Sequence, residues 1–223
     1  IESRFARLVV KYYIGPAFSS DATFKETRRA LENISSLAIL PWGMEVEKVK
    51  TEGIYAELIM PPDIPIPGKK IVLYLHGGGF VAGSPATYRD LAARISKSSG
   101  CPVLVPDYRL APENQYPAAN RDCFNIYRLL LQYGYSSNDI VIGGDSAGGC
   151  LALMTLLSLR EVDEPLPAAV FLISPLTDAV HLDGESMKSR ADMDPLLSPG
   201  IVEECMASYI GDIDSAPSIL SPI

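Results

Sequence analysis

Apolar positions divide the middle of the chain into short runs of strand length and longer stretches with helical spacing. The apolar runs are residues 54–60, 71–75, 102–106, 140–143 and 169–173. The helical stretches between them are residues 87–98, 117–133 and 147–160. Strands that alternate with helices are typical of βαβ crossovers and of a mostly parallel sheet. The pattern therefore predicts an α/β protein.

The two ends of the chain have a different pattern. Residues 21–35 have apolar side chains at helical spacing, with Asp21 as a candidate N-cap, and predict a helix. Residues 61–68 are rich in proline and predict a surface loop. After Ser174 the pattern changes: residues 178–195 are polar, and only residues 201–210 have a helical pattern. No further pair of strand and helix is expected before Ile223.

Residues 144–148, Gly-Asp-Ser-Ala-Gly, fit the pattern G-x-S-x-G, with an apolar strand before it and an apolar helix after it. Small neighbours on this tight turn let the Ser146 hydroxyl project while the helix passes close by. The amide of Ala147, near the positive end of the helix, is placed to stabilise developing negative charge. We identify Ser146 as a candidate nucleophile on an elbow formed with Gly144, Asp145 and Gly148. A structural Gly/Ser turn is the alternative.

A second motif, His-Gly-Gly-Gly at residues 76–79, follows the buried strand predicted at residues 71–75. A run of glycines costs conformational entropy on folding, which suggests backbone amides that another group must approach closely. In acyl transfer that group is an oxyanion, and each lost donor costs about 3 kcal/mol. A phosphate-binding loop is the rival interpretation, but no Gly-Lys-Ser/Thr sequence follows.

Three motifs together resemble the signatures of the hormone-sensitive-lipase-like esterases, a family with the α/β-hydrolase fold. They are residues 76–80, residues 107–113 with Pro117 and Ala118, and residues 144–149. The resemblance implies a mostly parallel sheet with helices on both faces and a helical cap. It divides the chain into cap helices (1–43), an incomplete hydrolase core (44–181), a second part of the cap (182–216) and a return towards the core (217–223).

The resemblance implies that Ser146 is the nucleophile. The amides of Gly78, Gly79 and Ala147 would form the oxyanion hole, and Gly77, at the start of the hole, would be its turn residue.

Supporting roles are implied for three charged or polar side chains. His76 would fix the glycine loop, while Arg109 and Glu113 would be buried ion-pair partners rather than catalysts. The cap would roof an apolar acyl pocket. Candidates for its walls, for which packing in the core or at the surface is an equal alternative, are Phe18, Trp42, Phe80, Val81 and Met187.

A serine hydroxyl needs a base, and in this fold the triad has the order Ser, Asp or Glu, then His. His181 is the only histidine after Ser146, and Asp178 and His181 superficially complete that order. The resemblance instead implies an acid after the strand that follows residues 169–173, and a histidine one strand later still. We therefore expect His181 to be an exposed loop or cap residue.

The chain is expected to lack the end of the resembling fold. Residues 209–212 and 217–222 are similar to the return from cap to core, which comes shortly before the strand that carries the acid. The last two strands would then be missing, leaving an unpaired apolar edge. A second polypeptide or a C-terminal segment outside this chain would carry the catalytic Asp and His. The start at Ile1, without an initiator methionine, likewise predicts a preceding segment.

Composition narrows the classes of partner. The chain has 223 residues, 19 basic and 27 acidic, with net charge −8 and no basic run longer than a pair, which argues against nucleic acid. No apolar stretch reaches the roughly 18 residues of a membrane span, so a soluble, cytoplasmic protein is expected. Four cysteines without C-x-x-C spacing predict dispersed buried thiols and neither metal nor redox site. The resemblance also allows a homodimer.

The leading interpretation is a serine carboxylesterase that hydrolyses small to medium acyl esters through an acyl-enzyme on Ser146, without cofactor. The alternative is a non-catalytic small-ligand-binding protein on the same fold, similar to the gibberellin receptor. A truncated pseudo-enzyme is the third hypothesis. The intact elbow and glycine loop favour the enzyme.

Overall fold

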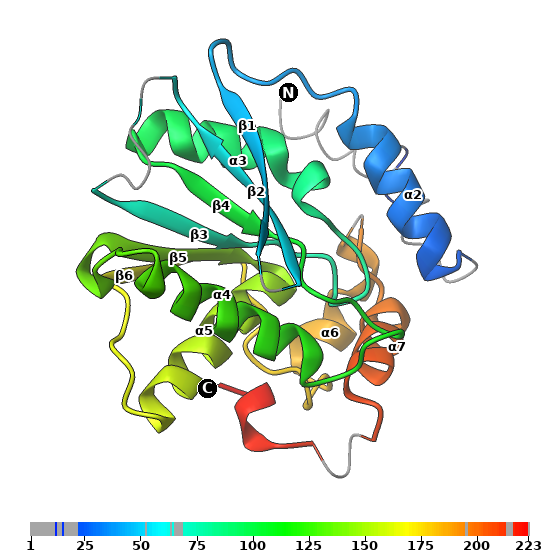
Figure 1. The fold of residues 1–223 in the computed structure, drawn as a ribbon. Coiled ribbons are helices and arrows are strands. Elements are labelled where there is room, and N and C mark those ends of the chain that lie inside the picture. The colour runs from blue at the N-terminus through cyan, green and yellow to red at the C-terminus, as the bar shows by residue number, and fades with distance from the viewer. Residues whose placement is uncertain are drawn as a thin grey trace.

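The computed structural model describes residues 22–51, 53–62, 64, 69–194, 196–212 and 216–222, together with Tyr12 and Gly15. Within them, one sheet of six strands has the order β1-β2-β4-β3-β5-β6 (Figure 1). The strands are β1 (Glu45–Thr51), β2 (Ile54–Met60), β3 (Ile71–Leu75), β4 (Val103–Pro106), β5 (Ile140–Asp145) and β6 (Ala169–Ile173). The pairs β1–β2 and β2–β4 are antiparallel, and the other pairs are parallel. The predicted α/β class is confirmed.

Helices cover both faces of this sheet. Helix α3 (Pro85–Ser99) packs on one face, where Ala92 and Ala93 meet Val72 and Val103. Helices α4 (Ala118–Gln132) and α5 (Ser146–Glu161) pack on the opposite face (Figure 1). Leu73 of β3 belongs to the core cluster on that side. Strand β3 is buried along its whole length, as expected for a strand covered on both faces.

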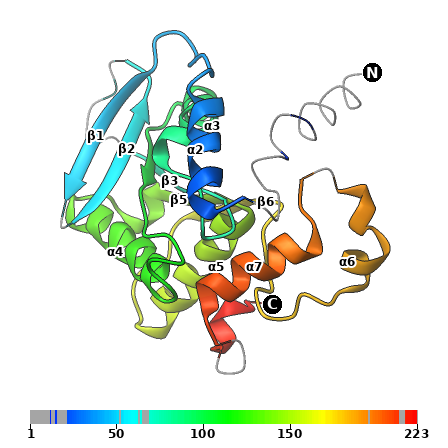
Figure 2. The same cartoon turned by 90° about the vertical axis from the view of Figure 1, so that its right-hand side faces the viewer.

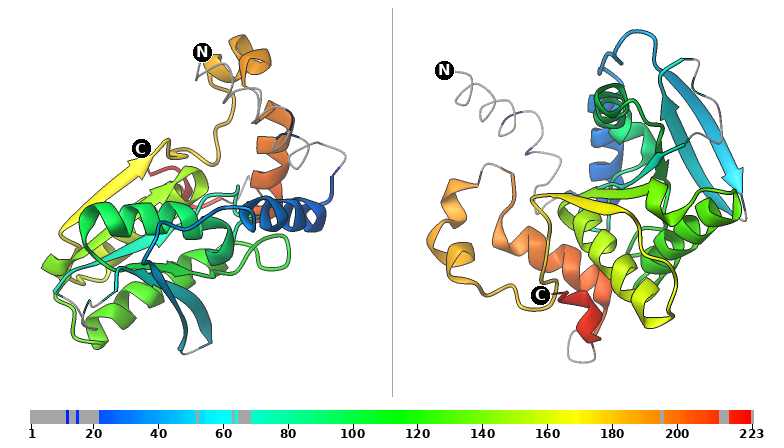
Figure 3. Two further views of the ribbon diagram at one scale, coloured as in Figure 1. Left: turned by 90° about the horizontal axis from the view of Figure 1, so that it is seen from above. Right: turned by 90° about the vertical axis from the view of Figure 1, so that its left-hand side faces the viewer.

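A further group of helices lies beyond the carboxyl ends of the parallel strands. It comprises α2 (Phe24–Ser35), α6 (Glu185–Ser189) and α7 (Pro199–Ile210) (Figures 1 and 2). The views from above and from the other side place α2 and α7 at this same end of the sheet (Figure 3). Short 3₁₀ turns are η3 (Ser137–Asp139), η4 (Ala191–Met193) and η6 (Ser218–Leu220). Ligands of open α/β sheets bind at the carboxyl ends of strands, so the helices border the place where a site is expected.

Several boundaries differ from the prediction. Helix α2 begins at Phe24 because Thr23 is its N-cap, with a capping box in which Glu26 accepts from the Thr23 amide at 2.8 Å. The proposed cap Asp21 lies outside the described residues, as do residues 65–68 of the expected loop. Strand β1 was not predicted, because its two apolar residues, Val46 and Val49, are three positions apart and give no alternating pattern. The expectation that only residues 201–210 are helical after Ser174 is wrong, because α6 and two 3₁₀ turns are also present.

The two edges of the sheet are unlike each other. Strand β1 is rich in Glu and Lys, which discourage pairing with another chain. Strand β6 is apolar, Ala-Val-Phe-Leu-Ile, and among the described residues it pairs only with β5. Ala169 is exposed, and Ile173 at the other end of the strand is 44% exposed. The expected unpaired apolar edge is therefore present in the described part of the chain.

Candidate active site

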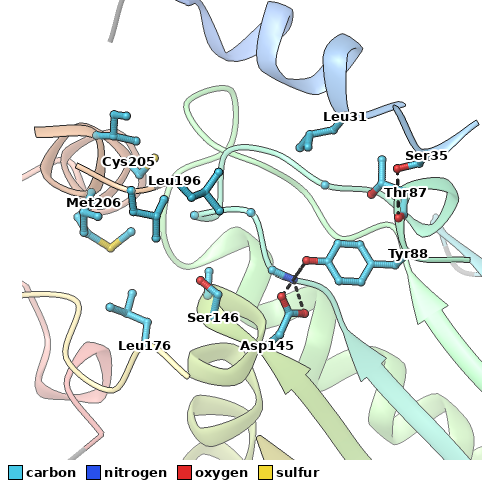
Figure 4. A pocket seen from close by; sticks show the side chains of 18 of the residues that line it. Leu31, Ser35, Thr87, Tyr88, Asp145, Ser146, Leu176, Leu196, Cys205 and Met206 are labelled. Atoms are coloured by element: carbon cyan, nitrogen blue, oxygen red, sulfur yellow. Dashed lines mark hydrogen bonds between the residues drawn. The ribbon is translucent and has the colours of Figure 1, made fainter. Parts of the chain in front are cut away.

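Ser146 is the first residue of α5 and directly follows the end of β5. Its φ of +50° lies in the left-handed region that non-glycine residues seldom adopt. Its hydroxyl is free of hydrogen bonds to the described residues, and the side chain faces a cavity in Figure 4. The structure therefore presents an uncommitted hydroxyl on a strained turn, which is the geometry expected of a nucleophile elbow.

Helix α5 starts close against the ends of β3 and β5. A Cβ at Gly148 would overlap the carbonyl oxygen of Leu75, the last residue of β3. A Cβ at Gly144 would overlap the carbonyl of Gly148 itself. Glycine at these two elbow positions is thus required by the close approach of backbone to backbone, which fixes Ser146 above the sheet.

The glycine loop forms a tight turn next to this elbow. Val81 and Ala82 donate their amides to the carbonyl of Gly78 at 3.1 and 2.9 Å. Gly78 has φ +122°, and a Cβ there would overlap the Ala82 carbonyl oxygen. No described residue accepts from the amides of Gly78 and Gly79. These amides are therefore available to a bound group.

The amide of Ala147 belongs to the same set. It lies in the first turn of α5, where amides have no partner within the helix, and where the helix dipole favours negative charge. Ala147, Ser146 and the glycines at 77–79 line one cavity. The site can thus offer three backbone donors around a serine hydroxyl.

The amide of Gly77, unlike those of Gly78 and Gly79, is hydrogen-bonded within the protein. It donates to Oδ1 of Asp145 at 3.0 Å and to the hydroxyl of Tyr88 at 3.0 Å. Gly77 therefore anchors the start of the glycine loop, and its grouping with the oxyanion hole is corrected, because its amide is not free to serve as a donor.

Asp145 is the centre of a network that the sequence analysis did not identify. Its Oδ1 also accepts from the hydroxyl of Tyr74 at 3.0 Å, and its Oδ2 accepts from Tyr88 at 2.8 Å. Burial raises the pKa of the Asp145 carboxyl, while the hydrogen bonds from Tyr88, Tyr74 and Gly77 limit that rise. A carboxylate next to a buried turn needs hydrogen-bond donors, and the signal in the sequence was Tyr74, a side chain with a hydroxyl within the apolar run 71–75.

His76 supports the glycine loop from within the protein core. Its ring is fully buried and stacks on Tyr108, with ring centroids 4.1 Å apart. Burial lowers its pKa to about 4, so the ring is neutral near pH 7, and Nδ1 lies 2.8 Å from the Gly77 carbonyl oxygen. The Tyr108 hydroxyl donates to the His76 carbonyl at 2.6 Å. His76 is thus placed to hold the loop rather than to exchange protons with a substrate.

The cavity has a volume of about 390 Å³ and walls that are mainly apolar (Figure 4). Helix α7 and the residues before it supply one wall, α2 supplies the opposite one, and Leu176 follows β6. The apolar lining residues are Leu31, Ile34, Leu176, Leu196, Leu197, Ile201, Val202, Cys205 and Met206. Of the polar side chains that also line the cavity, Asp145 and Tyr88 are hydrogen-bonded to each other, whereas the hydroxyl of Ser146 has no partner among the described residues. Such a cavity suits an uncharged, mainly apolar group.

The candidate wall residues named from the sequence do not line this cavity. Phe80 and Val81 are buried in the core, where Phe80 stacks on Tyr209. Trp42 is 96% exposed, and Met187 lines a separate hollow beside α6. Phe18 lies outside the described residues. The walls come instead from helix faces whose orientation depends on tertiary packing.

Asp178 and His181 form a pair away from Ser146. His181 is 73% exposed, and its Nδ1 lies 3.0 Å from Oδ2 of Asp178, so the expectation of an exposed loop residue is confirmed. Asp178 also accepts from the backbone amides of Val180 and His181 and from the hydroxyl of Ser221. The pair therefore fastens the return segment to the loop after β6, and neither residue hydrogen-bonds to Ser146.

Arg109 and Glu113 are ion-pair partners, but they are not buried as expected. Arg109 pairs with Asp122 at 2.8 Å and is 51% exposed, and Glu113 pairs with Arg28 at 2.8 Å and is 60% exposed. Both side chains project towards solvent, whereas Tyr108 and Ala111 of the same loop are buried.

We also searched the described residues for metal sites, disulfides and membrane-spanning helices. Among the described residues, no group of three or more His, Cys, Asp or Glu side chains could hold a metal ion. Cys123, Cys150 and Cys205 are buried free thiols, and Cys101 is half-buried and also free. In the described segments, no helix combines the length and the apolar character needed to cross a bilayer.

Comparisons with known proteins agree with this geometry. A family model described as alpha/beta hydrolase fold matches residues 72–223. LipR of Mycobacterium tuberculosis, which carries the name of an acetyl-hydrolase, is 35% identical over 93% of this chain and 67% of its own length. An esterase of Acinetobacter venetianus is 35% identical over 69% of this chain, which spans about half (51%) of that protein.

Solved structures extend the similarity to nearly the whole chain. The crystal structure of an esterase from the bacterial hormone-sensitive lipase family has a TM-score of 0.88 and 37% sequence identity, covering 97% of this chain and 72% of that protein. This chain is shorter than each of these relatives. Together with the elbow, the glycine loop and the sheet order, these similarities show that the chain belongs to the hormone-sensitive-lipase-like group of carboxylic-ester hydrolases within the α/β-hydrolase family.

Proposed function

We propose that this chain carries the nucleophile and the oxyanion hole of a serine carboxylesterase that acts on small to medium acyl esters. The observation that carries the proposal is the cavity lined by Ser146, Gly78 and Gly79, where neither the serine hydroxyl nor the two glycine amides are hydrogen-bonded to a described residue. The names of the relatives, esterase and acetyl-hydrolase, support the same reaction.

In the proposed reaction, Oγ of Ser146 attacks the ester carbonyl carbon while a histidine base takes its proton. The carbonyl oxygen becomes an oxyanion that accepts hydrogen bonds from the amides of Gly78, Gly79 and Ala147. The alcohol leaves with the proton from the histidine, and an acyl-enzyme on Ser146 remains. Water, deprotonated by the same base, then cleaves the acyl-enzyme and releases the carboxylic acid.

The base is proposed to come from a further segment that pairs with β6, either a second polypeptide or a C-terminal continuation. Support comes from the apolar, exposed edge of β6 and from the positions of the two histidines. His76 is buried against Gly77, and His181 is bound to Asp178 at the surface. A parallel strand on β6 would bring its own carboxyl end to the same end of the sheet as Ser146.

The cavity supports an uncharged acyl group of limited size. Its volume of about 390 Å³ and its leucine-rich walls favour burial of a short hydrocarbon chain, which gains about 0.8 kcal/mol for each buried CH₂ group. Within the same domain scheme, residues 1–43 and 182–216 are proposed to act as the cap, since α2 and α7 supply opposite walls.

The test combines turnover with covalent labelling. We expect hydrolysis of p-nitrophenyl butyrate and stoichiometric labelling by a fluorophosphonate, both lost in Ser146→Ala and both kept in Ser99→Ala, a surface control. Intact-mass spectrometry should show the label on this chain, with the base supplied by a second peptide or a longer chain. Hydrolysis that persists in Ser146→Ala would refute the proposal.

One observation favours the alternative of a non-catalytic ligand-binding protein, namely that no described residue is hydrogen-bonded to the Ser146 hydroxyl as a base. If the natural protein is neither labelled nor active, yet p-nitrophenyl butyrate raises its melting temperature, the ligand-binding function takes the place of the esterase. A protein that does neither would be a pseudo-enzyme.

A further inference from the structure

Arg28, on the outer helix α2, contacts the hydrolase core through its whole guanidinium group. Its Nε donates to the carbonyl of Val81 at 2.6 Å, and its Nη2 donates to the carbonyl of Ala111 at 2.6 Å. Its Nη1 and Nη2 also donate to the two carboxylate oxygens of Glu113 at 2.9 and 2.8 Å. One side chain therefore joins α2 to two separate loops of the core.

Both carbonyls belong to backbone that shapes the glycine loop. Val81 donates its amide to the carbonyl of Gly78, so a shift of Val81 moves the turn that orients the Gly78 amide. Ala111 donates its amide to the carbonyl of Phe80 at 2.9 Å, which braces the same turn from the other side. Val81 and Ala111 are buried, and the hydrogen bonds from Arg28 hold them where water has little access.

The same helix also forms a wall of the cavity. Leu31, about one turn after Arg28, and Ser35 line it (Figure 4). Ile34, about two turns after Arg28, is a further lining residue. A group bound in the cavity would contact Leu31 and Ile34. Because Arg28 of the same helix is hydrogen-bonded to Val81, a shift of the helix would also shift the backbone at Val81. Cavity wall and oxyanion loop are thus attached to one rigid element.

We propose that Arg28 is a positioning residue that couples the seating of helix α2 over the cavity to the shape of the oxyanion loop, residues 78–82. This inference rests on the proposed function, because the loop matters as an oxyanion hole only in an esterase. Arg28 touches no reacting atom, and it acts through the carbonyl of Val81. Its pair with Glu113 is the less important contact, because Glu113 is 60% exposed and exposed ion pairs contribute little.

Two variants separate the carbonyl contacts from the ion pair. Arg28→Lys keeps the charge but cannot reach two carbonyls and a carboxylate together, because an ammonium lacks the planar fork of donors. Glu113→Gln keeps the carbonyl contacts and removes the charge pair. Arg94→Ala, which breaks an exposed ion pair on α3, is the matched control.

The first measurement needs no turnover. Amide hydrogen exchange, followed by NMR on the full-length protein, reports the opening of the turn through the Val81 and Ala82 amides that bond to Gly78. We expect exchange about 10-fold faster or more in Arg28→Lys, and little change in Glu113→Gln and Arg94→Ala. Equal exchange in Arg28→Lys and the natural protein would overturn the inference, whether or not the protein hydrolyses esters.

The second measurement uses p-nitrophenyl butyrate at a temperature where circular dichroism shows all variants folded. We expect kcat to fall about 10- to 100-fold in Arg28→Lys with little change in KM, because a misplaced oxyanion donor affects the transition state more than the ground state. Glu113→Gln should retain kcat within about threefold. A natural protein without activity would refute the proposed function alone, whereas an active protein with unchanged kcat in Arg28→Lys would refute the role of Arg28.

Discussion

Oδ1 of Asp145 accepts a hydrogen bond from the backbone amide of Gly77 at 3.0 Å, so the residue before Ser146 is fastened to the residue before the oxyanion loop. Gly77 follows β3 and Asp145 ends β5, and these two strands are neighbours in the sheet. The hydrogen bond links the ends of the two strands, and it thereby sets the distance between the serine hydroxyl and the amides at 78 and 79.

Removing the Asp145 carboxylate should damage this arrangement. Asp145→Ala leaves the Gly77 amide and the hydroxyls of Tyr74 and Tyr88 without their acceptor, so we expect a loss of about 2 kcal/mol in the free energy of unfolding and about 100-fold in kcat. Asp145→Asn, which keeps one acceptor oxygen, should lose less of both. Urea unfolding and ester hydrolysis measure the two effects, and Asp183→Asn at the surface is the control. Natural activity in Asp145→Ala would contradict the prediction.

The buried ring of His76 should make stability depend on pH. Burial lowers its pKa to about 4 in the folded state, against about 6.5 when unfolded. Between these values the unfolded chain binds more protons, so stability is complete above about pH 6.5 and falls by about 3 kcal/mol as the pH drops to about 4.

Urea unfolding between pH 4 and pH 7 measures this dependence, and NMR titration of the ring gives the pKa directly. His76→Asn should flatten the dependence over this range. A ring of His76 that titrates near pH 6.5 in the folded protein would show the prediction to be wrong.

Glu57 and Arg89 make an ion pair in which only one partner is buried. Glu57 is 2% exposed, and both of its carboxylate oxygens accept from Arg89 at 2.5 Å. Arg89→Ala leaves a buried carboxylate without its partner, so the free energy of unfolding should fall by about 2 to 4 kcal/mol. The double change Glu57→Met with Arg89→Met should recover most of the loss. Chemical denaturation measures both, and Arg94→Ala should shift the value by about 0.5 kcal/mol or less.

The return segment should loosen in acid through Asp178. Partial burial acts to raise the pKa of Asp178, but hydrogen bonds from His181, Ser221 and Val180 outweigh it and lower the pKa to about 2. The ionised carboxylate therefore stabilises the folded return segment fully at pH values above about 3.9, which is the pKa of Asp in the unfolded chain. This stabilisation is lost as the pH falls towards about 2. Protection of residues 216–222 against hydrogen exchange, relative to the intrinsic rate at each pH, should fall over that range, and Asp178→Asn should show the lower protection already at pH 7. An Asp178 pKa near 4 by NMR would contradict the assignment.

The sequence predicted best those elements that local features delimit. Strands β2, β3 and β6 have the predicted bounds, because each is an apolar run ended by glycine, proline or polar residues. Helix α2 begins at Phe24, whereas a cap at Asp21 predicted a start at residue 22. The difference arises because Thr23 caps the helix through reciprocal hydrogen bonds with Glu26. Strand β1 was missed, since it is mostly charged and its two valines are three positions apart, so the sequence has no period of two.

The candidate site was only partly predictable for a similar reason. The elbow and the glycine loop follow from short motifs that need particular backbone angles, which leave a signature in the residue types. The walls of the cavity leave no such signature in the sequence, because they depend on which face of α2 and α7 points towards the cavity. Phe80, next to the loop, has φ +64° and points into the core, a direction that no local pattern indicates.

The cavity draws its reactive atoms and its walls from different parts of the chain. The serine and the loop amides are attached to the ends of β5 and β3, whereas Leu31, Ile201 and Met206 come from the surrounding helices. In the proposed esterase, substitutions on those helices can therefore change which acyl group fits while the backbone around Ser146 and the glycine loop stays in place. Such a division makes substrate preference evolvable, since selection can alter the enclosure without rebuilding the reaction centre.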